Sequence, residues 1–361
     1  MDALKDEQSA AVTLALAYPT RGRTLGDSLR ASGSAVAALT EAARGGTRLP
    51  ALPPEEWRAL RARAAAVVAG SDRDGTHVVP WGSAAYPDRL RALADPPAVL
   101  FLHGEPRLLA RPGVAVVGAR NASPYGLRHA EGLARQLSQA GAVVFSGLAL
   151  GIDAAAHRGA LDGPGGTVGV LGAGLDVPYP HRHRDLRRRI VERGLLVTEF
   201  APGTPPLPHH FPQRNRIVAA LAAAVVVVEA GEKSGALITV DHALDLGRAV
   251  FAVPGRIDSA RSRGCNQLLR EGAGVVVSAA SLLDDLVGVL PCALQVQPSS
   301  WTPDDPSAAH VWRRLDEPLG LDDLRLRTDL PLADLFAALT ALELEGRVVR
   351  IEGDLYARAD V

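Results

Sequence analysis

Three glycine-rich loops are the segments of this sequence that are best suited to bind an anion. Each follows a short apolar run, and they read Val117-Gly118-Ala119-Arg120, Ser146-Gly147-Leu148 and Leu171-Gly172-Ala173-Gly174. Glycine directly after a strand lets backbone N–H groups approach a phosphate, and the start of the next helix adds a favourable dipole. One such loop is also expected in an ordinary tight turn. Three on successive strands predict an anion site along one carboxyl edge of a sheet.

Two further segments add positive charge to this prediction. Phe211-Pro212-Gln213-Arg214-Asn215-Arg216 opens a helical stretch, and arginines at such a start suit bidentate phosphate contacts, although a solvated helix start would look the same. A turn with two glycines follows at Glu229–Gly235 and contains Lys233, one of only two lysines in the chain. We interpret this turn as a second phosphate-binding element.

Common nucleotide cofactors do not fit these loops. Val177 stands where the third glycine of the dinucleotide fingerprint belongs, which argues against NAD. Glu232 precedes Lys233 where a Walker A loop requires glycine, which argues against ATP hydrolysis. We therefore expect no cofactor.

A metal site is not expected either. Asp153 and His157 are four residues apart on an expected helix, but no further ligands stand at a suitable spacing. A capping aspartate beside a buried, hydrogen-bonded histidine explains this pair more simply. The other histidines of the central region lie in Pro-rich or Arg-rich loops, namely His181, His183, His209 and His210.

An arginine-rich run extends from Arg182 to Arg193. It contains six arginines against Asp185 and Glu192. Such a run is usually a solvated helix face, but beside a phosphate-binding edge it would extend the binding track for a polyanion.

Composition indicates an ordinary globular protein of the reducing cytoplasm. The chain has 361 residues, a net charge of −1 and 47% hydrophobic residues. Met1–Ala10 is polar and acidic, unlike a signal peptide, and the longest apolar run, Leu221–Val228, is too short to span a membrane. Two cysteines without a CxxC pair predict neither disulfides nor a cysteine zinc site. Residues 111–290 carry 19 basic against 15 acidic residues and residues 301–361 carry 7 against 13, so a polyanion site is expected in the middle of the chain.

The elements that must position these loops follow from hydrophobic patterning. Residues 1–70 have helical periodicity, and residues 75–110 look irregular and proline-rich. From residue 111, β-branched runs alternate with helical stretches at a spacing typical of βαβ units, which predicts a doubly wound parallel sheet in an α/β fold. The expected strands are Val114–Val117, Ala142–Phe145, Thr167–Leu171, Leu195–Thr198, Ala224–Val228, Ala249–Val253 and Gly274–Val277.

The end of the chain is expected to form a separate small domain. Residues 288–310 are polar and proline-rich, which is typical of a linker. Residues 311–361 then contain three short helical stretches, Val311–Leu315, Leu321–Thr328 and Leu332–Glu345, followed by a hairpin. This pattern predicts a winged helix. Leu332–Glu345, the expected recognition helix, contains no Lys or Arg, so we predict a protein-interaction or regulatory domain that adds little to DNA affinity.

Several motifs of the sequence, in the same order along the chain, resemble those of a known family. The series VVGAR, SGLALGIDAAAH, TVGVLGAGLDVPYP, FPQRNRIVAAL, VVVVEAGEKSGALIT, GRAVFAVPG and GCNQLLREGA resembles the DprA (Smf) family, in order from about Pro80 to Val277. The resemblance implies a Rossmann-like DNA-binding domain over residues 71–287, with a helical SAM-like domain over residues 1–70 and the winged helix as additions.

The resemblance also implies a function and partners. They are binding of single-stranded DNA, protection of incoming DNA in natural transformation (competence), loading of the RecA recombinase in homologous recombination, and a homodimer. The chain is not expected to be an enzyme. The family has an asparagine shortly after its YP motif where this chain has His181-Arg182-His183, so the local contact there is expected to differ. The dimer surface is expected around Asn266–Val277, with Leu268 and Leu269 either in the interface or packed inside their own subunit.

The candidate DNA-binding residues combine the glycine loops with the cationic segments, and Arg120 is expected to contact a DNA phosphate. They are Gly118, Arg120, Ser123, Ser146, Gly147, Arg214, Asn215, Arg216, Lys233, Ser234 and Gly235.

One enzymatic alternative remains open at this stage. Related Rossmann-like proteins hydrolyse the glycosidic bond of nucleoside monophosphates with an arginine and a glutamate. Glu199 and Glu229 end expected strands and are candidates for such a carboxylate, but they would equally pair an arginine or orient a loop.

Overall fold

The computed structural model describes residues 2–19, 22–46, 48–290, 303–345, 347–351 and 353–358. The chain divides into two compact units, Met1–Val296 and Gln297–Val361. In the described ranges no helix is both long and apolar enough to cross a membrane.

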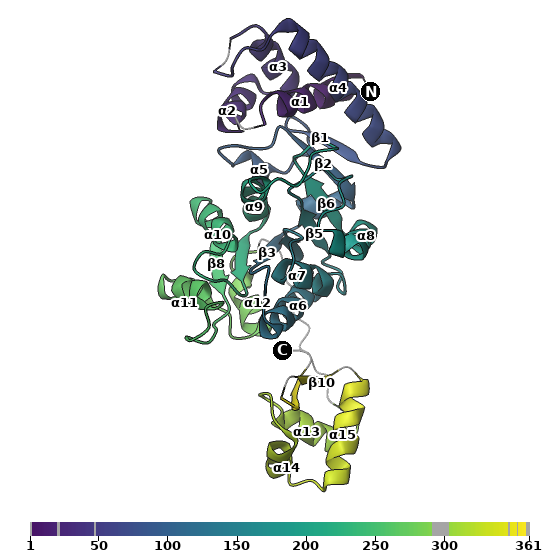
Figure 1. Cartoon of the computed structure of the whole chain (residues 1–361), viewed down its shortest axis with the longest axis vertical. Helices are drawn as coiled ribbons and strands as arrows, with labels where there is room; N and C mark the ends of the chain where they lie inside the picture. Colours follow the sequence, from purple (N-terminus) through teal and green to yellow (C-terminus); the bar gives the residue numbers. More distant parts are fainter. Residues whose placement is uncertain are drawn as a thin grey trace. The chain divides into compact units, whose positions relative to one another are not determined.

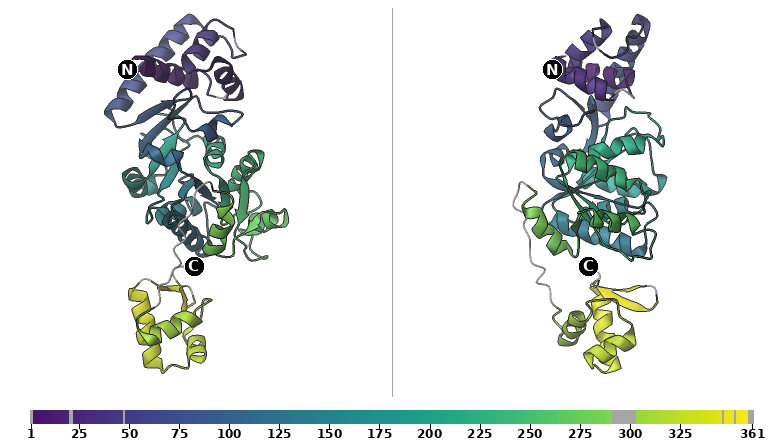
Figure 2. Two further views of the ribbon diagram at one scale, coloured as in Figure 1. Left: turned by 180° about the vertical axis from the view of Figure 1, so that it is seen from behind. Right: turned by 90° about the vertical axis from the view of Figure 1, so that its left-hand side faces the viewer.

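The first unit begins with helices α1 (Asp2–Ala17), α2 (Gly22–Ser32), α3 (Ala35–Ala43) and α4 (Pro54–Arg73), as the periodicity predicts. They lie at the end of the sheet that carries β1 and β2 (Figures 1 and 2). Their buried side chains, such as Leu14 and Leu29, belong to the same hydrophobic cluster as Val99 and Phe101 of β2. The helices therefore share a hydrophobic core with the sheet. The domain limits expected at residues 70, 287 and 310 stay predictions.

Within the described residues, nine strands form one sheet in the order β1-β2-β6-β5-β4-β3-β7-β8-β9. The strands from β3 onward are parallel, as expected, and each lies within or at the edge of a predicted run. Their bounds are β3 (Gly113–Val117), β4 (Val143–Ser146), β5 (Thr167–Val170), β6 (Leu195–Thr198), β7 (Ala224–Val227), β8 (Ala249–Ala252) and β9 (Gly274–Val275).

The expectation that residues 75–110 are irregular is wrong. This segment contains β1 (His77–Pro80), α5 (Asp88–Arg91), β2 (Val99–Gly104) and the 3-10 helix η1 (Pro106–Ala110). β2 pairs antiparallel with β1 on one side and with β6 on the other. β2 is stabilised by pairing with β6, almost a hundred residues away, and β1 in turn pairs with β2. Local sequence patterning cannot reveal such distant pairing.

Helices cover both faces of the parallel part of the sheet. Successive residues of β3 alternate between the hydrophobic clusters on the two faces of the sheet. Val114 and Val116 pack with α6 (Pro124–Gln139), α7 (Ile152–Ala160) and α12 (Ala279–Val287). Ala115 and Val117 face the cluster of α9 (His210–Leu221) and α10 (Ala236–Asp245). The remaining elements of this unit are η2 (His181–His183), α8 (Arg184–Arg193) and α11 (Arg263–Arg270).

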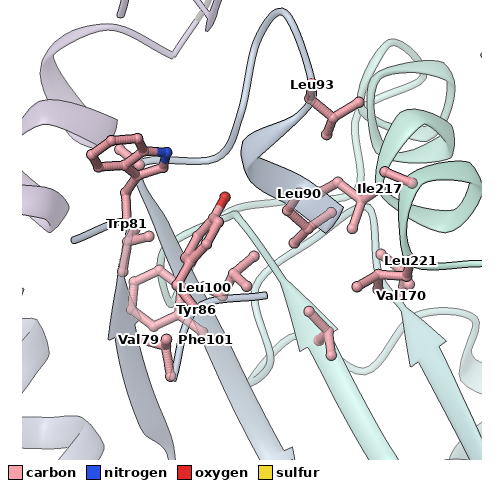
Figure 3. Packing of buried hydrophobic residues seen from close by; sticks show 14 of the residues in the cluster. Val79, Trp81, Tyr86, Leu90, Leu93, Leu100, Phe101, Val170, Ile217 and Leu221 are labelled. Carbon is pink, nitrogen blue, oxygen red and sulfur yellow. The ribbon is translucent and has the colours of Figure 1, made fainter. Parts of the chain in front are cut away.

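The antiparallel end of the sheet is packed tightly onto α9. Figure 3 shows Leu90 of α5 next to Ile217 of α9, with Tyr86 and Phe101 to their left. The Tyr86 hydroxyl donates to the Pro97 carbonyl at 2.8 Å, which satisfies the polar end of this buried ring. This packing fixes the position of α9, the helix that carries the FPQRNR segment.

The second unit has the elements of a winged helix. It contains α13 (Pro306–Arg314), α14 (Leu321–Thr328), α15 (Leu332–Leu344) and the hairpin of β10 (Val348–Ile351) and β11 (Leu355–Arg358). Val311, Leu324, Leu339 and Tyr356 are among the residues of its separate core. The first helix begins at Pro306, inside the expected 288–310 linker, because the Asp305 carboxylate caps it by accepting from the Ala308 N–H at 2.7 Å. Residues 291–302 of that linker lie outside the described residues.

Candidate nucleic-acid interface

The main pocket lies where the strand order reverses. β3 and β7 are neighbours in the sheet, and the chain proceeds from them in opposite directions, so the loops at their carboxyl ends diverge. The pocket between these loops and α9 has a volume of about 570 Å³. Eight of the predicted site residues line it: Gly118, Arg120, Gly147, Arg214, Asn215, Lys233, Ser234 and Gly235.

Arg120 is the most accessible cation on the β3 side of the pocket. Its side chain is exposed, and its guanidinium lies over the ring of Phe211, 5.0 Å from the ring centroid. In the described part of the chain, no carboxylate lies within 4.0 Å of this guanidinium. Arg120 therefore keeps its hydrogen-bond donors for a ligand while the aromatic ring holds it in position.

Phe211 is a pocket residue that the sequence prediction did not select. It lines the pocket from α9, and its ring packs against Tyr179, with 5.4 Å between the ring centroids. The first residue of the FPQRNR segment was the available signal, since an aromatic residue at a phosphate-binding edge offers a surface for stacking.

The opposite wall consists of the turn before α10. Lys233 is exposed, and no acidic group of the described residues lies within 4.0 Å of its ammonium group. Asn215 ties this turn to α9, because its side-chain amide donates to the Gly235 carbonyl at 3.1 Å. The pocket therefore has one free cation on each wall, Arg120 and Lys233.

Arg214 forms the floor of the pocket rather than a free cation. It is 3% exposed, and its guanidinium donates to the carbonyls of Gly147 and Val170. A Cβ atom at position 147 would stand 2.4 Å from that guanidinium, so the contact requires glycine. Burial lowers the pKa of Arg214 to about 10, and the nearby Asp153 carboxylate opposes this shift.

Arg216 does not face the pocket, which corrects the expectation that both arginines bind phosphate. It is 4% exposed, and it pairs with Glu199 through two hydrogen bonds of 2.9 and 2.7 Å and with Asp95 at 2.9 Å. Burial lowers its pKa, but the Glu199 and Asp95 carboxylates outweigh this and raise the pKa of Arg216 above its usual value. Arg216 therefore links α9 to two distant segments.

The two predicted serines are engaged with the protein itself. Ser146 is fully buried, and its hydroxyl donates to the Val116 carbonyl at 2.7 Å. Ser123 caps α6 by accepting from the Gly126 N–H at 3.1 Å, and its hydroxyl donates to Glu229 at 2.6 Å. Neither serine lines the pocket, so their direct contact with a ligand stays a prediction.

Glu229 connects the loop after β3 to the end of β7. Its carboxylate accepts from the N–H and the hydroxyl of Ser123, and its carbonyl accepts from the Ala119 N–H at 2.7 Å. The other candidate acid, Glu199, is held by Arg216. Both carboxylates thus adopt the structural role that the sequence left open, and neither lines the pocket.

The Asp153 and His157 pair also adopts its structural interpretation. The Asp153 carboxylate accepts from the N–H groups of Gly147 and Ala149 at 3.1 and 3.3 Å. His157 is fully buried, and its Nδ1 lies 2.7 Å from the Thr167 hydroxyl. Among the described residues no group of three or more His, Cys, Asp or Glu side chains is arranged to hold a metal ion.

A smaller cavity of about 60 Å³ adjoins the main pocket. The two share Arg120, Gly147, Ala149 and Phe211. On its far side this cavity is lined by Tyr179, Pro180 and Arg187. The pocket surface therefore extends towards the segment that begins α8.

Comparison with known proteins identifies the family. A family model described as DNA recombination-mediator protein A matches residues 77–287, more than half of the chain. The chain belongs to this family. A model described as DprA winged helix domain matches residues 296–354 of this family member, in agreement with the predicted winged helix.

Relatives and solved structures agree with this assignment. The chain is 38% identical over 286 residues to Protein Smf of Escherichia coli, covering 77% of this chain and 76% of the relative. It is similar to the X-ray structure of DNA processing protein A (DprA) from Streptococcus pneumoniae, with a TM-score of 0.62, 34% identity and coverage of 79% and 96% of the two chains.

A second solved structure, DNA processing protein A from Helicobacter pylori, has a TM-score of 0.55 and 31% identity and covers 60% of this chain and 97% of its own. That structure concerns the single-stranded DNA binding mode of the Helicobacter pylori protein. The resemblance to the DprA (Smf) family and the doubly wound α/β fold are confirmed.

Proposed function

We propose that this family member binds single-stranded DNA in the pocket at the switch between β3 and β7. One observation carries the proposal. Arg120 and Lys233, which have no acidic partner among the described residues, lie on opposite walls of a pocket of about 570 Å³ that is lined by glycine-rich loops. Phosphate oxygens suit both cations as hydrogen-bond acceptors of opposite charge. The single-stranded DNA binding mode of the Helicobacter pylori relative supports the same ligand class.

The pocket residues divide into two groups in this proposal. Arg120 and Lys233 neutralise phosphates, and Phe211 offers its ring to an unpaired base. Arg214 and Arg216 are buried and hold the loops and α9 in the geometry that the ligand meets. A base must be unpaired to reach Phe211, so the pocket favours single strands over duplexes.

We further propose that the chain acts as a recombination mediator in the cytoplasm. It would protect incoming single-stranded DNA in natural transformation and load a RecA recombinase, without catalysing a reaction itself. Family membership supports this role.

The homodimer of this proposal would form through the β9 edge of the sheet. β9 is an edge strand of only two residues; Val275 within it is 48% exposed, and Val277 just after it is 74% exposed. Leu268 and Leu269 pack partly against their own core, so the exposed valines are the better candidates for contact. Light scattering on the full chain tests this; a monomer at micromolar concentration would exclude the dimer.

A titration of single- and double-stranded oligonucleotides at several salt concentrations tests the ligand class. The single strand should bind more tightly at every salt concentration, with a log–log slope of about −0.7 per neutralised phosphate. Equal affinity for both forms would refute a pocket that selects unpaired bases.

A further inference from the structure

The arginine-rich run that the sequence left open forms η2 and α8, next to the proposed site. Leu186 and Ile190 bury one face of α8 against Leu148 and Leu171, which belong to the loops after β4 and β5. α8 is therefore anchored on the same loops that line the smaller cavity.

The arginines of α8 divide between two sides of the helix. At about 100° per residue, Arg184 and Arg188 lie opposite Leu186 and Ile190, and Arg187 lies between them and the buried face. Arg189 and Arg193 fall beside the buried face instead. We call Arg182, Arg184 and Arg188 the arginine stripe, because all three are exposed and follow one another from η2 along α8.

Arg187, which lies between the arginine stripe and the buried face of α8, connects the stripe to the pocket. Its guanidinium donates to the Leu175 carbonyl at 2.7 Å, and it lines the smaller cavity together with Tyr179 and Pro180. That cavity shares Arg120 and Phe211 with the main pocket. The lining of the two adjoining pockets thus links the free cation Arg120 to Arg187 of α8.

The arginines on the α8 side of the pocket have fewer acidic partners than the arginines on the Lys233 side. Within the described residues no carboxylate lies within 4.0 Å of Arg182 or Arg184, and Arg188 has only the exposed Asp185 at 3.6 Å. On the Lys233 side of the pocket, three exposed arginines have acidic partners: Arg256–Asp258 at 2.8 Å, Arg261–Glu229 at 3.9 Å and Arg263–Glu232 at 3.9 Å. These three arginines are therefore neutralised, whereas Arg182 and Arg184 are not.

We infer that a single strand held in the pocket leaves it over Tyr179 and Pro180 and continues along the arginine stripe, which neutralises further phosphates. This inference rests on the proposed function of the pocket. Arg184 and Arg188 are separated by about 6 Å along the helix axis, comparable with neighbouring phosphates on an extended strand. Because arginines on a helix surface contact phosphates without reading bases, the stripe should bind every sequence alike.

Two double variants of equal charge test the inference on the full chain. R184A/R188A removes two residues of the stripe, whereas R189A/R193A removes the same charge from the same helix on its other side. The probes are fluorescent oligothymidylates of about 6 nucleotides, which occupy the pocket alone, and roughly three times that length, which also reach α8. Alanine is compatible with the helix, and circular dichroism verifies the fold of both variants.

The stripe predicts a specific pattern of losses. R184A/R188A should weaken binding of the long probe about fivefold or more and make the salt slope less negative by about 1.4, with little effect on the short probe. R189A/R193A should have a smaller effect on the affinity for either probe. Equal losses in the two variants, or an unchanged salt slope, would overturn the inference in favour of a solvated helix face.

The pocket variant R120A separates this inference from the proposed function. If R120A weakens both probes while R184A/R188A weakens neither, the pocket stands and the stripe is refuted. If R120A weakens neither probe, the proposed pocket function itself fails.

Discussion

Replacing Arg120 by alanine removes a cation that pairs with no carboxylate of the described residues. Its guanidinium lies over the Phe211 ring, so the change breaks no ion pair in the described part of the chain. Hydrogen bonds to charged groups contribute about 1.5–3 kcal/mol, which corresponds to a loss of affinity of roughly 10- to 150-fold. One lost phosphate contact should also make the salt slope less negative by about 0.7.

Fluorescence anisotropy on single-stranded oligonucleotides of several sequences measures both effects. The loss should be the same on every sequence, because a phosphate contact carries no base information. Arg107→Ala is the matched control: its side chain is 92% exposed, and it lies on η1, which packs near Gly166 at the start of β5 and so at the opposite edge of the sheet. This control should bind as the wild type does.

The thermal unfolding curve decides whether a loss reflects the site or the fold. Arg120 is exposed, so its replacement should change the free energy of unfolding by no more than about 0.5 kcal/mol. Wild-type affinity in a folded Arg120→Ala protein would refute the assignment of Arg120 to the ligand.

Three further predictions concern the fold and the tail. Arg216→Ala should lower the free energy of unfolding by about 3–5 kcal/mol in chemical denaturation, because Glu199 would stay buried without its partner; a loss below about 1 kcal/mol would contradict this. Burial lowers the pKa of His157 to about 3, so the unfolded chain protonates this histidine first and the native state should lose about 2 kcal/mol between neutral pH and pH about 5. In denaturation curves recorded across that pH range, His157→Gln should lack this pH-dependent loss of stability. The same dependence of the free energy of unfolding on pH in both proteins would refute the prediction. Deleting residues 300–361 should leave single-strand affinity within about threefold, or about 0.7 kcal/mol, since α15 carries no basic residue. A tenfold loss in a folded dimeric truncation would show that the tail binds DNA.

The parallel sheet and its loops are the part of the molecule that local sequence determines. β-branched runs such as Val225–Val227 bury both faces of a strand, and the glycines after them mark the carboxyl edge. The winged-helix elements are likewise close to their expected bounds. The start of α13 was missed although Asp305 and Pro306 carry an N-cap followed by proline at the first helical position.

The separate roles of the two arginines in the FPQRNR segment could not be predicted from local sequence. Arg214 and Arg216 look alike in sequence, yet one meets the carbonyl of Val170 and the other meets Asp95, 121 residues away. Tertiary packing decides which cation is buried. Solvent exposure and unpaired charge, which identify Arg120 and Lys233, are properties of the folded chain.

The contacts of Glu229 have a calorimetric consequence. One carboxylate secures Ser123, and the adjoining carbonyl secures Ala119, so the loop that carries Arg120 is already fixed before any ligand arrives. Binding that must first order a loop buries additional apolar surface and gives a large negative change in heat capacity. A strand that meets a preformed loop should instead give a small change, set mainly by the ring of Phe211. Ser123→Ala loosens that loop, and it should make the heat capacity change more negative even though residue 123 does not line the pocket.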